Sequence, residues 1–130
     1  WNYSNIRRFT KMGLLCFTGD SSFMLPALTL GAAGCIDGSP CTAPEIWVTL
    51  WNAYHSGDIK TAEAAQQTGA ELYDIVQEFG FPVSLKVLLS ERLGVECGDP
   101  RPPGTPLTPD RRKALWKKAS DLGLKRVTVD

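Results

Sequence analysis

The chain has 130 residues, 43% of them hydrophobic, and its 14 basic and 14 acidic residues balance to a formal net charge of zero. This hydrophobic content suffices for one packed domain, and the charge balance leaves no overall field that would attract nucleic acid or an anionic membrane. No apolar run reaches the roughly 18 residues that a membrane-spanning helix needs.

The four cysteines, at positions 16, 35, 41 and 97, show neither a CxxC pair nor a zinc-binding spacing. Cys16 and Cys35 lie in apolar runs, where a thiol behaves as a small hydrophobic group. No signal-peptide pattern is present. We therefore expect reduced thiols, no bound metal and a cytoplasmic location.

The chain begins with Trp1 rather than Met, and a helical pattern that includes Ile6 and Phe9 starts almost at once. From this we expect the chain to begin inside a structural element. It would then be a fragment, a processed product or one part of a split protein.

Residues 14–39 predict a strand, a helix and a second strand. Leu14–Thr18 is the first strand, and Ser21 or Ser22 can cap a helix over Phe23–Leu30. Gly34–Ile36 is short and apolar, as expected for a strand buried on both faces. The crossover has the length of a right-handed parallel unit.

Four helices are predicted after these strands. Thr42 and Glu45 have the spacing of a capping box, which would open a helix that ends at Gly57. Asp58 can cap the longest helix, which ends at Gly80. Further helices are expected around 87–93 and at 110–122, separated by a stiff, proline-rich connection over 95–109. The basic residues of the last helix alternate with apolar ones, which indicates a solvated amphipathic face.

Two parallel strands make an unstable sheet, because both faces and both edges need partners. We therefore expect additional strands to come from another segment or another chain.

The carboxyl ends of parallel strands lie at one rim, where α/β proteins place their chemistry. Asp20 and Asp37 follow the two strands and are candidates for acid–base or ligand-binding roles. Alternatively, Asp20 caps the next helix and Asp37 binds amides of its own loop. Gly19 and Ile36 can offer backbone groups to a small ligand.

Other polar residues are weaker candidates. Ser21, Ser22 and Ser39 could contact a ligand, although serines after strands usually cap helices. His55 lies at the C-terminus of a predicted helix, beside Gly57, and no Gly-x-Ser-x-Gly motif accompanies it. Lys86 lies in an apolar segment, where a lowered lysine pKa would suit Schiff-base chemistry. Its distance from the rim instead favours an ammonium that is paired or reaches solvent.

An ordered set of short motifs, from about Leu14 onward, resembles the C-terminal part of the dihydrodipicolinate synthase/N-acetylneuraminate lyase family. The motifs are Phe17-Thr18-Gly19-Asp20, Leu25-Pro26-Ala27-Leu28, Gly31-Ala32-Ala33-Gly34, Cys35-Ile36, Ala43-Pro44, Gly57-Asp58, Phe81-Pro82-Val83-Ser84-Leu85-Lys86 and Arg101-Pro102-Pro103. The resemblance implies an α/β fold, namely the C-terminal portion of a (β/α)8 TIM barrel with an added C-terminal helical region. Residues 1–57 would form the last barrel units, with strands seven and eight, and residues 58–130 the C-terminal helices.

The same resemblance implies roles for the rim residues. Gly19 matches a glycine that lines the substrate pocket, and Ile36 matches a residue whose backbone faces the pyruvate-derived part. Asp20 and Ser21 occupy places that some members use for the second substrate. Gly38 falls where sialic-acid lyases carry a serine, for which Ser39 could substitute. Asp37 departs from the small neutral residue usual there, which argues for an unusual substrate.

The family's reactive lysine and proton-relay tyrosine lie on earlier strands, upstream of Trp1, and Lys86 matches a noncatalytic position. The resemblance thus implies a class I Schiff-base aldolase that makes or breaks a C–C bond of pyruvate or another 2-keto acid without a cofactor. The intact enzyme would be a homodimer or homotetramer. This chain would supply pocket wall and be inactive alone. Sugar-acid or sialic-acid aldolases, hydratase-aldolases and a noncatalytic helical interaction module are the alternatives.

Overall fold

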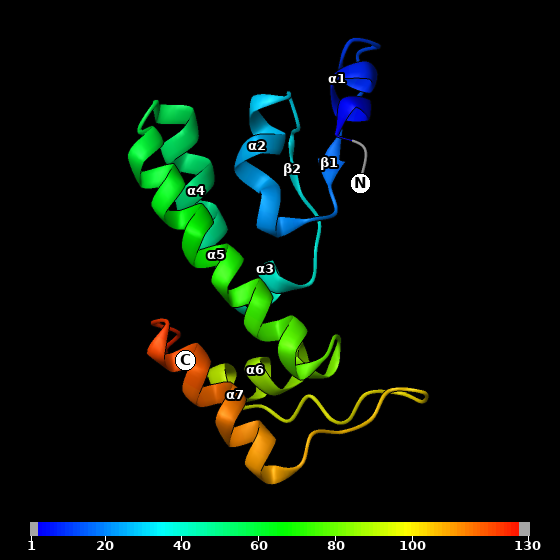
Figure 1. Ribbon diagram of the computed structural model, residues 1–130, viewed down its shortest axis with the longest axis vertical. Helices are drawn as coiled ribbons and strands as arrows, with labels where there is room; N and C mark the ends of the chain where they lie inside the picture. The colour runs from blue at the N-terminus through cyan, green and yellow to red at the C-terminus, as the bar shows by residue number, and fades with distance from the viewer. Residues whose placement is uncertain (1–2, 128–130) are drawn as a thin grey trace.

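The computed structural model describes residues 3–127; Trp1, with the expectation attached to it, lies outside them. Two short strands and a small helix layer form one end of the molecule, and long helices form the rest (Figure 1). In chain order the elements are α1 (Ser4–Thr10), β1 (Phe17–Thr18), the 3₁₀ turn η1 (Ser21–Phe23), α2 (Met24–Thr29), β2 (Gly34–Cys35), α3 (Ser39–Thr42), α4 (Pro44–Ser56), α5 (Ile59–Phe79), α6 (Val83–Leu93) and α7 (Pro109–Asp121).

The strands β1 and β2 are parallel, with Phe17 opposite Gly34 and Thr18 opposite Cys35. The strand–helix–strand order is as predicted, but the paired segments are shorter than the expected 14–18 and 34–36. Leu15, which precedes β1, is 82% exposed. Within residues 3–127 each strand has one neighbour, so little holds the flanking residues in a ladder.

Most predicted helix boundaries are confirmed. Gly57 and Gly94 end α4 and α6 in the left-handed conformation, with φ of 81° and 66°. The Asp58 carboxylate accepts a hydrogen bond from the Thr61 amide at 3.1 Å and so caps α5. Thr108 caps α7, with Pro109 at its first position.

The predicted capping box is wrong. Thr42 belongs to the short helix α3, which the sequence did not indicate, and its hydroxyl donates to the Ser39 carbonyl at 2.8 Å. Ala43 therefore precedes α4 without a side-chain cap. The Glu45 carboxylate instead pairs with the Arg92 guanidinium at 2.8 Å.

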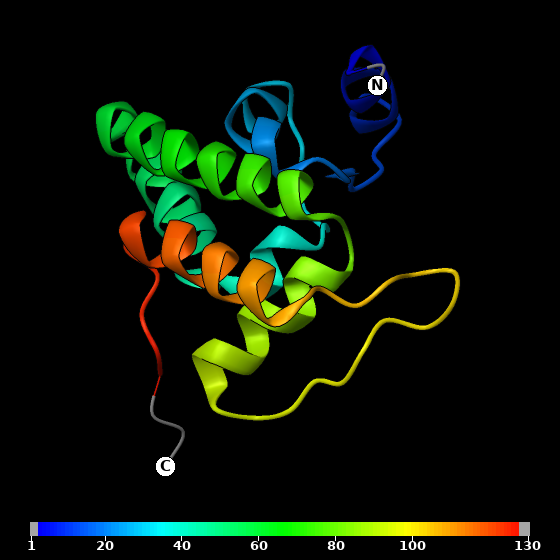
Figure 2. The ribbon, with the colours of Figure 1, turned by 60° about the horizontal axis from the view of Figure 1, so that its bottom comes forward.

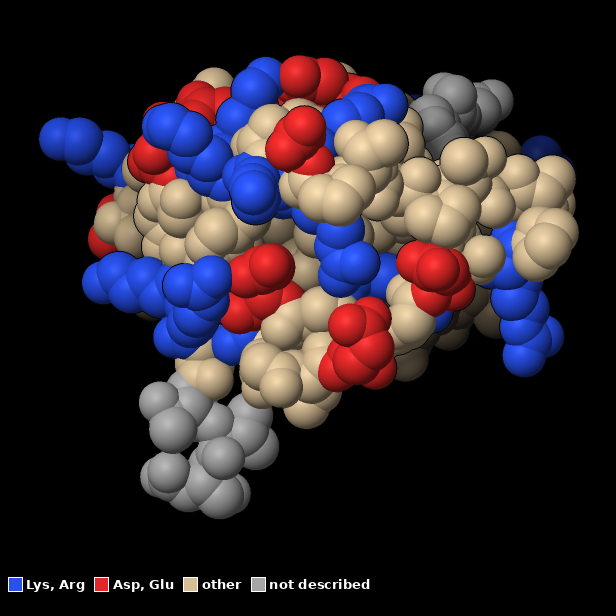
Figure 3. All heavy atoms as spheres, turned by 90° about the horizontal axis from the view of Figure 1, so that it is seen from below, with Lys and Arg blue, Asp and Glu red and all other residues tan. Residues whose placement is uncertain are grey.

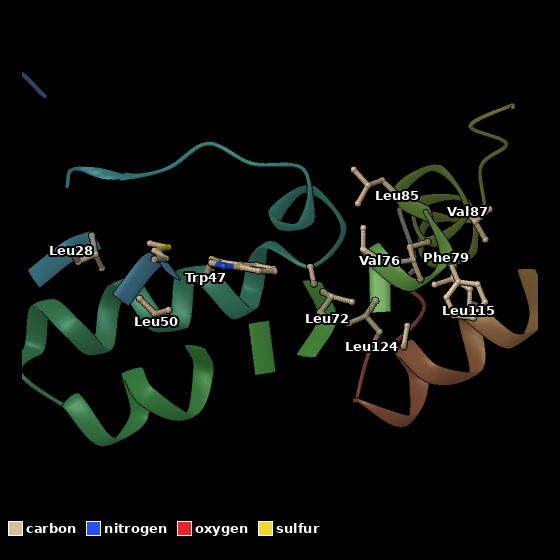
Figure 4. Packing of buried hydrophobic residues seen from close by; sticks show 14 residues of the cluster. Leu28, Trp47, Leu50, Leu72, Val76, Phe79, Leu85, Val87, Leu115 and Leu124 are labelled. Carbon is tan, nitrogen blue, oxygen red and sulfur yellow. The ribbon is translucent and has the colours of Figure 1, made fainter. Parts of the chain in front are cut away.

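The larger of two hydrophobic clusters in the described chain extends from the strand end through the helices (Figure 4). It is built from residues of α2, α4, α5, α6 and α7, and its buried members include Met24, Leu28, Trp47, Leu50, Leu72, Val76, Leu85, Leu88, Leu115 and Ala119. The core crosses residue 57, where the predicted division into barrel units and C-terminal helices lies. That division remains a prediction.

The buried Arg92 connects three segments of the chain. Its guanidinium donates to the carbonyls of Thr42 and of Lys125, the latter at 3.0 Å, besides pairing with Glu45. An arginine buried in this way is stabilised because each of its three nitrogens meets an acceptor. Arg92 thereby holds α6 against α3, the start of α4 and the segment after α7.

The segment between α6 and α7 is extended, as its prolines predict, and projects from the helical body (Figure 2). Its start is fixed on α6, because Lys86 Nζ donates to the Cys97 carbonyl at 2.7 Å and the Cys97 amide donates to Ser90 Oγ at 3.0 Å.

The surface is mixed in charge, in line with the zero net charge. Figure 3 shows basic and acidic side chains interspersed on the face seen from below. The helix α7 is amphipathic as predicted, since Leu115 is buried while Lys117 and Lys118 are exposed. Within residues 3–127 no helix is both long and apolar enough to cross a membrane.

The helix α5 is joined to the turn after β1 by one side chain, that of Gln66. Its Oε1 accepts from the Leu25 amide at 2.7 Å, and its Nε2 donates to the carbonyls of Ser21 and Ser22 at 3.2 and 2.9 Å. The Trp47 indole donates to the same Ser21 carbonyl at 3.3 Å. These bonds position the strand end against the helices.

We predict that Gln66→Ala lowers the free energy of unfolding by about 2 kcal/mol, because half-buried backbone groups lose their partners. Gln67→Ala is the matched control: Gln67 is exposed on the same helix and bonds only Glu71. Its replacement should cost less than about 0.5 kcal/mol. Urea denaturation of the protein measures both values, and equal losses would contradict the role assigned to Gln66.

Candidate functional site

The carboxyl ends of β1 and β2 lie at the same end of the sheet, towards α3 in Figure 1. The loop that follows β1 contains Gly19, Asp20 and Ser21, and the loop that follows β2 contains Ile36, Asp37 and Gly38. Two sets of candidate residues nearly twenty positions apart are thus brought together at one rim, as predicted.

Asp37 bridges the two loops. Its Oδ2 accepts hydrogen bonds from the Ser21 amide at 3.0 Å and from Ser21 Oγ at 2.6 Å, while its Oδ1 accepts from the Gly38 amide at 2.6 Å. The interpretation in which Asp37 binds amides of its own loop is confirmed, and the bridge to Ser21 adds a contact that the sequence did not indicate. Ser21 is fully buried, so its hydroxyl serves this bridge.

Asp20 organises the turn after β1. Its Oδ1 accepts from the Ser22 amide at 3.1 Å and from Ser22 Oγ at 2.5 Å, and its Oδ2 accepts from the Tyr3 hydroxyl at 3.2 Å. Asp20 is therefore the N-cap of η1, which agrees with the alternative prediction that it caps the next helix. The expectation that Ser21 or Ser22 caps the helix is wrong, because both serines donate to carboxylates.

The two carboxylates make this rim electronegative. The pKa of the Cys35 thiol is raised to about 12. Burial is the largest cause, and the negative charges of Asp37 and Asp20 follow in that order. Burial, followed by Asp20, raises the pKa of Tyr3 to about 12. Within the described chain the ion pairs lie elsewhere, so no lysine or arginine neutralises Asp20 or Asp37.

Tyr73 of α5 lies near the same carboxylates, and sequence reasoning missed it. Burial raises the pKa of its phenol, and Asp20 and Asp37 raise it further. Tyr73 is seven residues after Gln66, a spacing that puts both on one helix face. That spacing was the available signal, but it becomes meaningful only once Gln66 is known to contact the rim.

Gly19 and Ile36 directly follow β1 and β2 and are exposed, Ile36 to 71%. The Ile36 amide donates to the Thr18 carbonyl at 2.8 Å, which continues the ladder by one bond. Thr18 Oγ1 accepts from the Asp20 amide at 3.2 Å, which tightens the turn at Gly19. Backbone groups at both strand ends are thus held in place.

Gly38 has an ordinary backbone conformation, with a φ of −73°, and two side chains pack closely against it. A Cβ atom at this position would lie 2.4 Å from Cε2 of Phe81 and 2.6 Å from Cδ1 of Leu85. A serine here would displace those side chains.

The weaker candidates lie apart from this rim or are otherwise engaged. Ser39 is buried, and Lys86 donates to the Cys97 carbonyl as its structural alternative predicts. His55 lies near the far end of α4 from α3, where its ring stacks on Trp51 at 4.0 Å and its Nδ1 is 2.8 Å from the Trp51 carbonyl. Residues 3–127 contain no cluster of three metal-ligating side chains.

An apolar groove of about 270 Å³ lies beside β2. Its walls include Phe17 of β1, Cys35 of β2, and Trp47, Val48 and Trp51 of α4. It has few polar groups, so it differs in character from the rim.

Comparison with proteins of known sequence matches residues 2–122 to the dihydrodipicolinate synthetase family. A 4-hydroxy-tetrahydrodipicolinate synthase of Mycolicibacterium paratuberculosis is 36% identical over 105 residues, which are 81% of this chain and 35% of that protein. An uncharacterized DapA-like lyase of Halobacterium salinarum is 34% identical over 111 residues, 85% of this chain and 36% of that protein. The chain thus spans about a third of the length of these relatives.

Solved structures agree. A 2-keto-3-deoxygluconate aldolase of Sulfolobus sulfataricus, in complex with D-KDPG, is 26% identical with a TM-score of 0.78 over 84% of this chain and 37% of its own. YagE of E. coli K12, in complex with pyruvate, shares the fold at 22% identity, with a TM-score of 0.81 over 95% of this chain and 44% of its own. The chain belongs to the dihydrodipicolinate synthetase family.

Proposed function

We propose that this chain forms the seventh and eighth strand units and the C-terminal helices of a pyruvate-type Schiff-base lyase or synthase. The observation that carries the proposal is the rim at which the loops after β1 and β2 meet, with Gly19 and Ile36 open at the strand ends. The family match and the pyruvate and D-KDPG bound by two structural relatives support this chemistry.

In the proposed enzyme, a lysine upstream of Trp1 forms an imine with a 2-keto acid. The imine acts as an electron sink, so a C–C bond next to it can be made or broken near neutral pH. The backbones of Gly19 and Ile36 bind the keto-acid part of the imine. Asp20 faces the second substrate, while Ser21, Asp37 and Gly38 hold the two loops at their correct separation.

The remaining barrel strands, in the same or a companion chain, would cover the apolar surface of the sheet. Phe17 is 50% exposed and Leu15 82% exposed, and the apolar groove lies along β2. Exposed apolar surface of this kind is typical of an interface. Closure of the barrel would also give both strands the second neighbour that a parallel sheet needs. We further propose that the intact enzyme is a homodimer or homotetramer in the cytoplasm.

Borohydride trapping tests the proposed chemistry. The intact protein that contains this chain, treated with pyruvate and sodium borohydride, should gain the mass of one reduced pyruvyl group on a lysine outside residues 1–130. Borohydride traps the imine because it reduces the C=N bond to a stable amine.

Pyruvate without borohydride is the control, and Lys86→Arg should label as fully as the unsubstituted protein. A label on Lys86 would contradict the assigned role of this chain. The absence of any label would instead favour a noncatalytic fragment or a helical interaction module.

The electronegative rim can be measured through Cys35. Asp37→Asn should lower the pKa of the Cys35 thiol below about 12, because the repulsion between carboxylate and thiolate is removed. The amide oxygen of the new side chain can still accept from Ser21. The rate of Cys35 alkylation by iodoacetamide at alkaline pH should therefore rise severalfold.

Peptide mapping by mass spectrometry follows the alkylation of Cys35. Asp99→Asn, in the exposed connection before α7, is the matched control and should leave the rate unchanged. An unchanged rate for Asp37→Asn would show that the Asp37 carboxylate does not raise the pKa of the Cys35 thiol.

A further inference from the structure

Two cysteines that the proposed site does not use lie beside the same turns of α6. Cys41 belongs to α3, and Cys97 lies in the connection between α6 and α7. Both thiols are free; Cys41 is exposed and Cys97 is half-buried. The chain thus has two reduced cysteines that are far apart in the sequence and positioned by one helix.

The helix α3 packs against α6 and is held there at both of its ends (Figure 2). At its start, a Cβ atom on the N-cap residue Gly38 would lie 2.6 Å from Cδ1 of Leu85. At its end, the Arg92 guanidinium donates to the carbonyl of Thr42. Cys41 directly precedes Thr42, so α6 fixes the backbone that carries the Cys41 thiol.

Cys97 is held by a neighbouring face of the same helix. Its carbonyl accepts from Lys86 Nζ at 2.7 Å, and its amide donates to Ser90 Oγ at 3.0 Å. Lys86 and Ser90 are four residues apart and therefore lie on one face of α6. The connection that follows Cys97 forms neither helix nor strand. Its start can therefore adjust to the close approach of two sulfur atoms that a disulfide needs.

The thiol of Cys97 lies close enough to that of Cys41 to affect its ionisation. The pKa of the Cys41 thiol is raised. Burial is the largest cause, a backbone hydrogen bond opposes it, and the charges of Asp37 and Cys97 add to it. A raised pKa leaves little thiolate at neutral pH, so the thiol reacts slowly and its reaction accelerates as the pH rises.

We propose that Cys41 and Cys97 are a reversible modification site, at which oxidised glutathione converts the two thiols into a disulfide. The Cys41 thiolate attacks the glutathione disulfide, whose S–S bond breaks and releases one glutathione thiolate. The Cys97 thiolate then attacks Cys41 Sγ and releases the second glutathione. The two cysteines lose two protons and two electrons in total, and the glutathione disulfide gains them as two glutathione thiols.

The disulfide ties the loop after β2 to the connection between α6 and α7. The helix α3 begins directly after Asp37 and Gly38, so a cross-link at Cys41 restrains the segment that follows these rim residues. The cross-link also closes a long loop that contains α4, α5 and α6, which removes conformational freedom from the unfolded chain. This inference does not depend on the proposed function.

Peptide mapping tests the pairing. The intact protein that contains this chain is reduced, exposed to oxidised glutathione, blocked with N-ethylmaleimide and digested with trypsin and Asp-N without reductant. These proteases place the four cysteines of the chain in four separate peptides. The peptides of Cys41 and Cys97 should be joined, with a mass about 2 Da below their sum, and dithiothreitol should separate them. The rate of joining should rise about tenfold between pH 7 and pH 8, as the thiolate fraction does.

Serine variants follow the two steps. In Cys97→Ser the second step is lost, so Cys41 should accumulate as a mixed disulfide with glutathione. Cys16→Ser is the matched control, because Cys16 is a half-buried cysteine that packs against the smaller hydrophobic cluster. Its link between Cys41 and Cys97 should form at the unsubstituted rate. The melting temperature of the oxidised, unsubstituted protein should lie at least about 3 °C above that of the reduced protein.

Each contrary outcome overturns a stated part of the inference. A bond from Cys41 to another cysteine, or a stable glutathione adduct on Cys41 of the unsubstituted protein, would overturn the pairing. Free Cys41 and Cys97 thiols after prolonged exposure would overturn the site itself. An unchanged melting temperature with the link in place would overturn the restraint. The mapping uses the unsubstituted protein, so it does not depend on the folding of any variant.

Discussion

The hydrogen bonds between Asp37 and Ser21 are the interaction on which the rim depends. The strands β1 and β2 pair over two residues each, so the ladder alone fixes their ends weakly. Asp37 supplies a second connection, in which a carboxylate accepts from both the amide and the hydroxyl of Ser21. Bonds to a charged acceptor are stronger than neutral ones, and burial of Ser21 shields them from water.

The bridge is effective because Ser21 is also held from its other side. Its carbonyl accepts from the Trp47 indole and from Gln66 Nε2, so α4 and α5 both bind the residue that Asp37 binds. The helix α5 runs from the turn at Gly57 down to α6, and Gln66 and Tyr73 lie on one of its faces. The helix α5 therefore connects the core, through Gln66, to the turn that follows β1.

The local features of the fold were predictable from the sequence, whereas the long-range ones were not. Gly57, Asp58 and Thr108 act within three or four residues of themselves, so their patterns were sufficient. Thr42 and Glu45 have the spacing of a capping box. The Glu45 carboxylate instead binds Arg92, 47 residues further along the chain. Gln66 contacts a turn 45 residues earlier, which periodicity cannot indicate. Gly19 and Ile36 became candidates for specific roles only through family resemblance. Every residue carries the same backbone groups, so the sequence alone does not show which of them bind a ligand.

Both acidic residues of the rim, Asp20 and Asp37, are already hydrogen-bonded within the protein. Asp20 and Asp37 accept three hydrogen bonds each, which hold the two side chains in a fixed orientation. Such groups contribute through charge and shape, by binding the part of a substrate that does not react. Binding energy from nonreacting parts can be used to orient the reacting bond. In the proposed enzyme the upstream lysine would therefore carry out the reaction, while the two carboxylates would influence which partner reaches it.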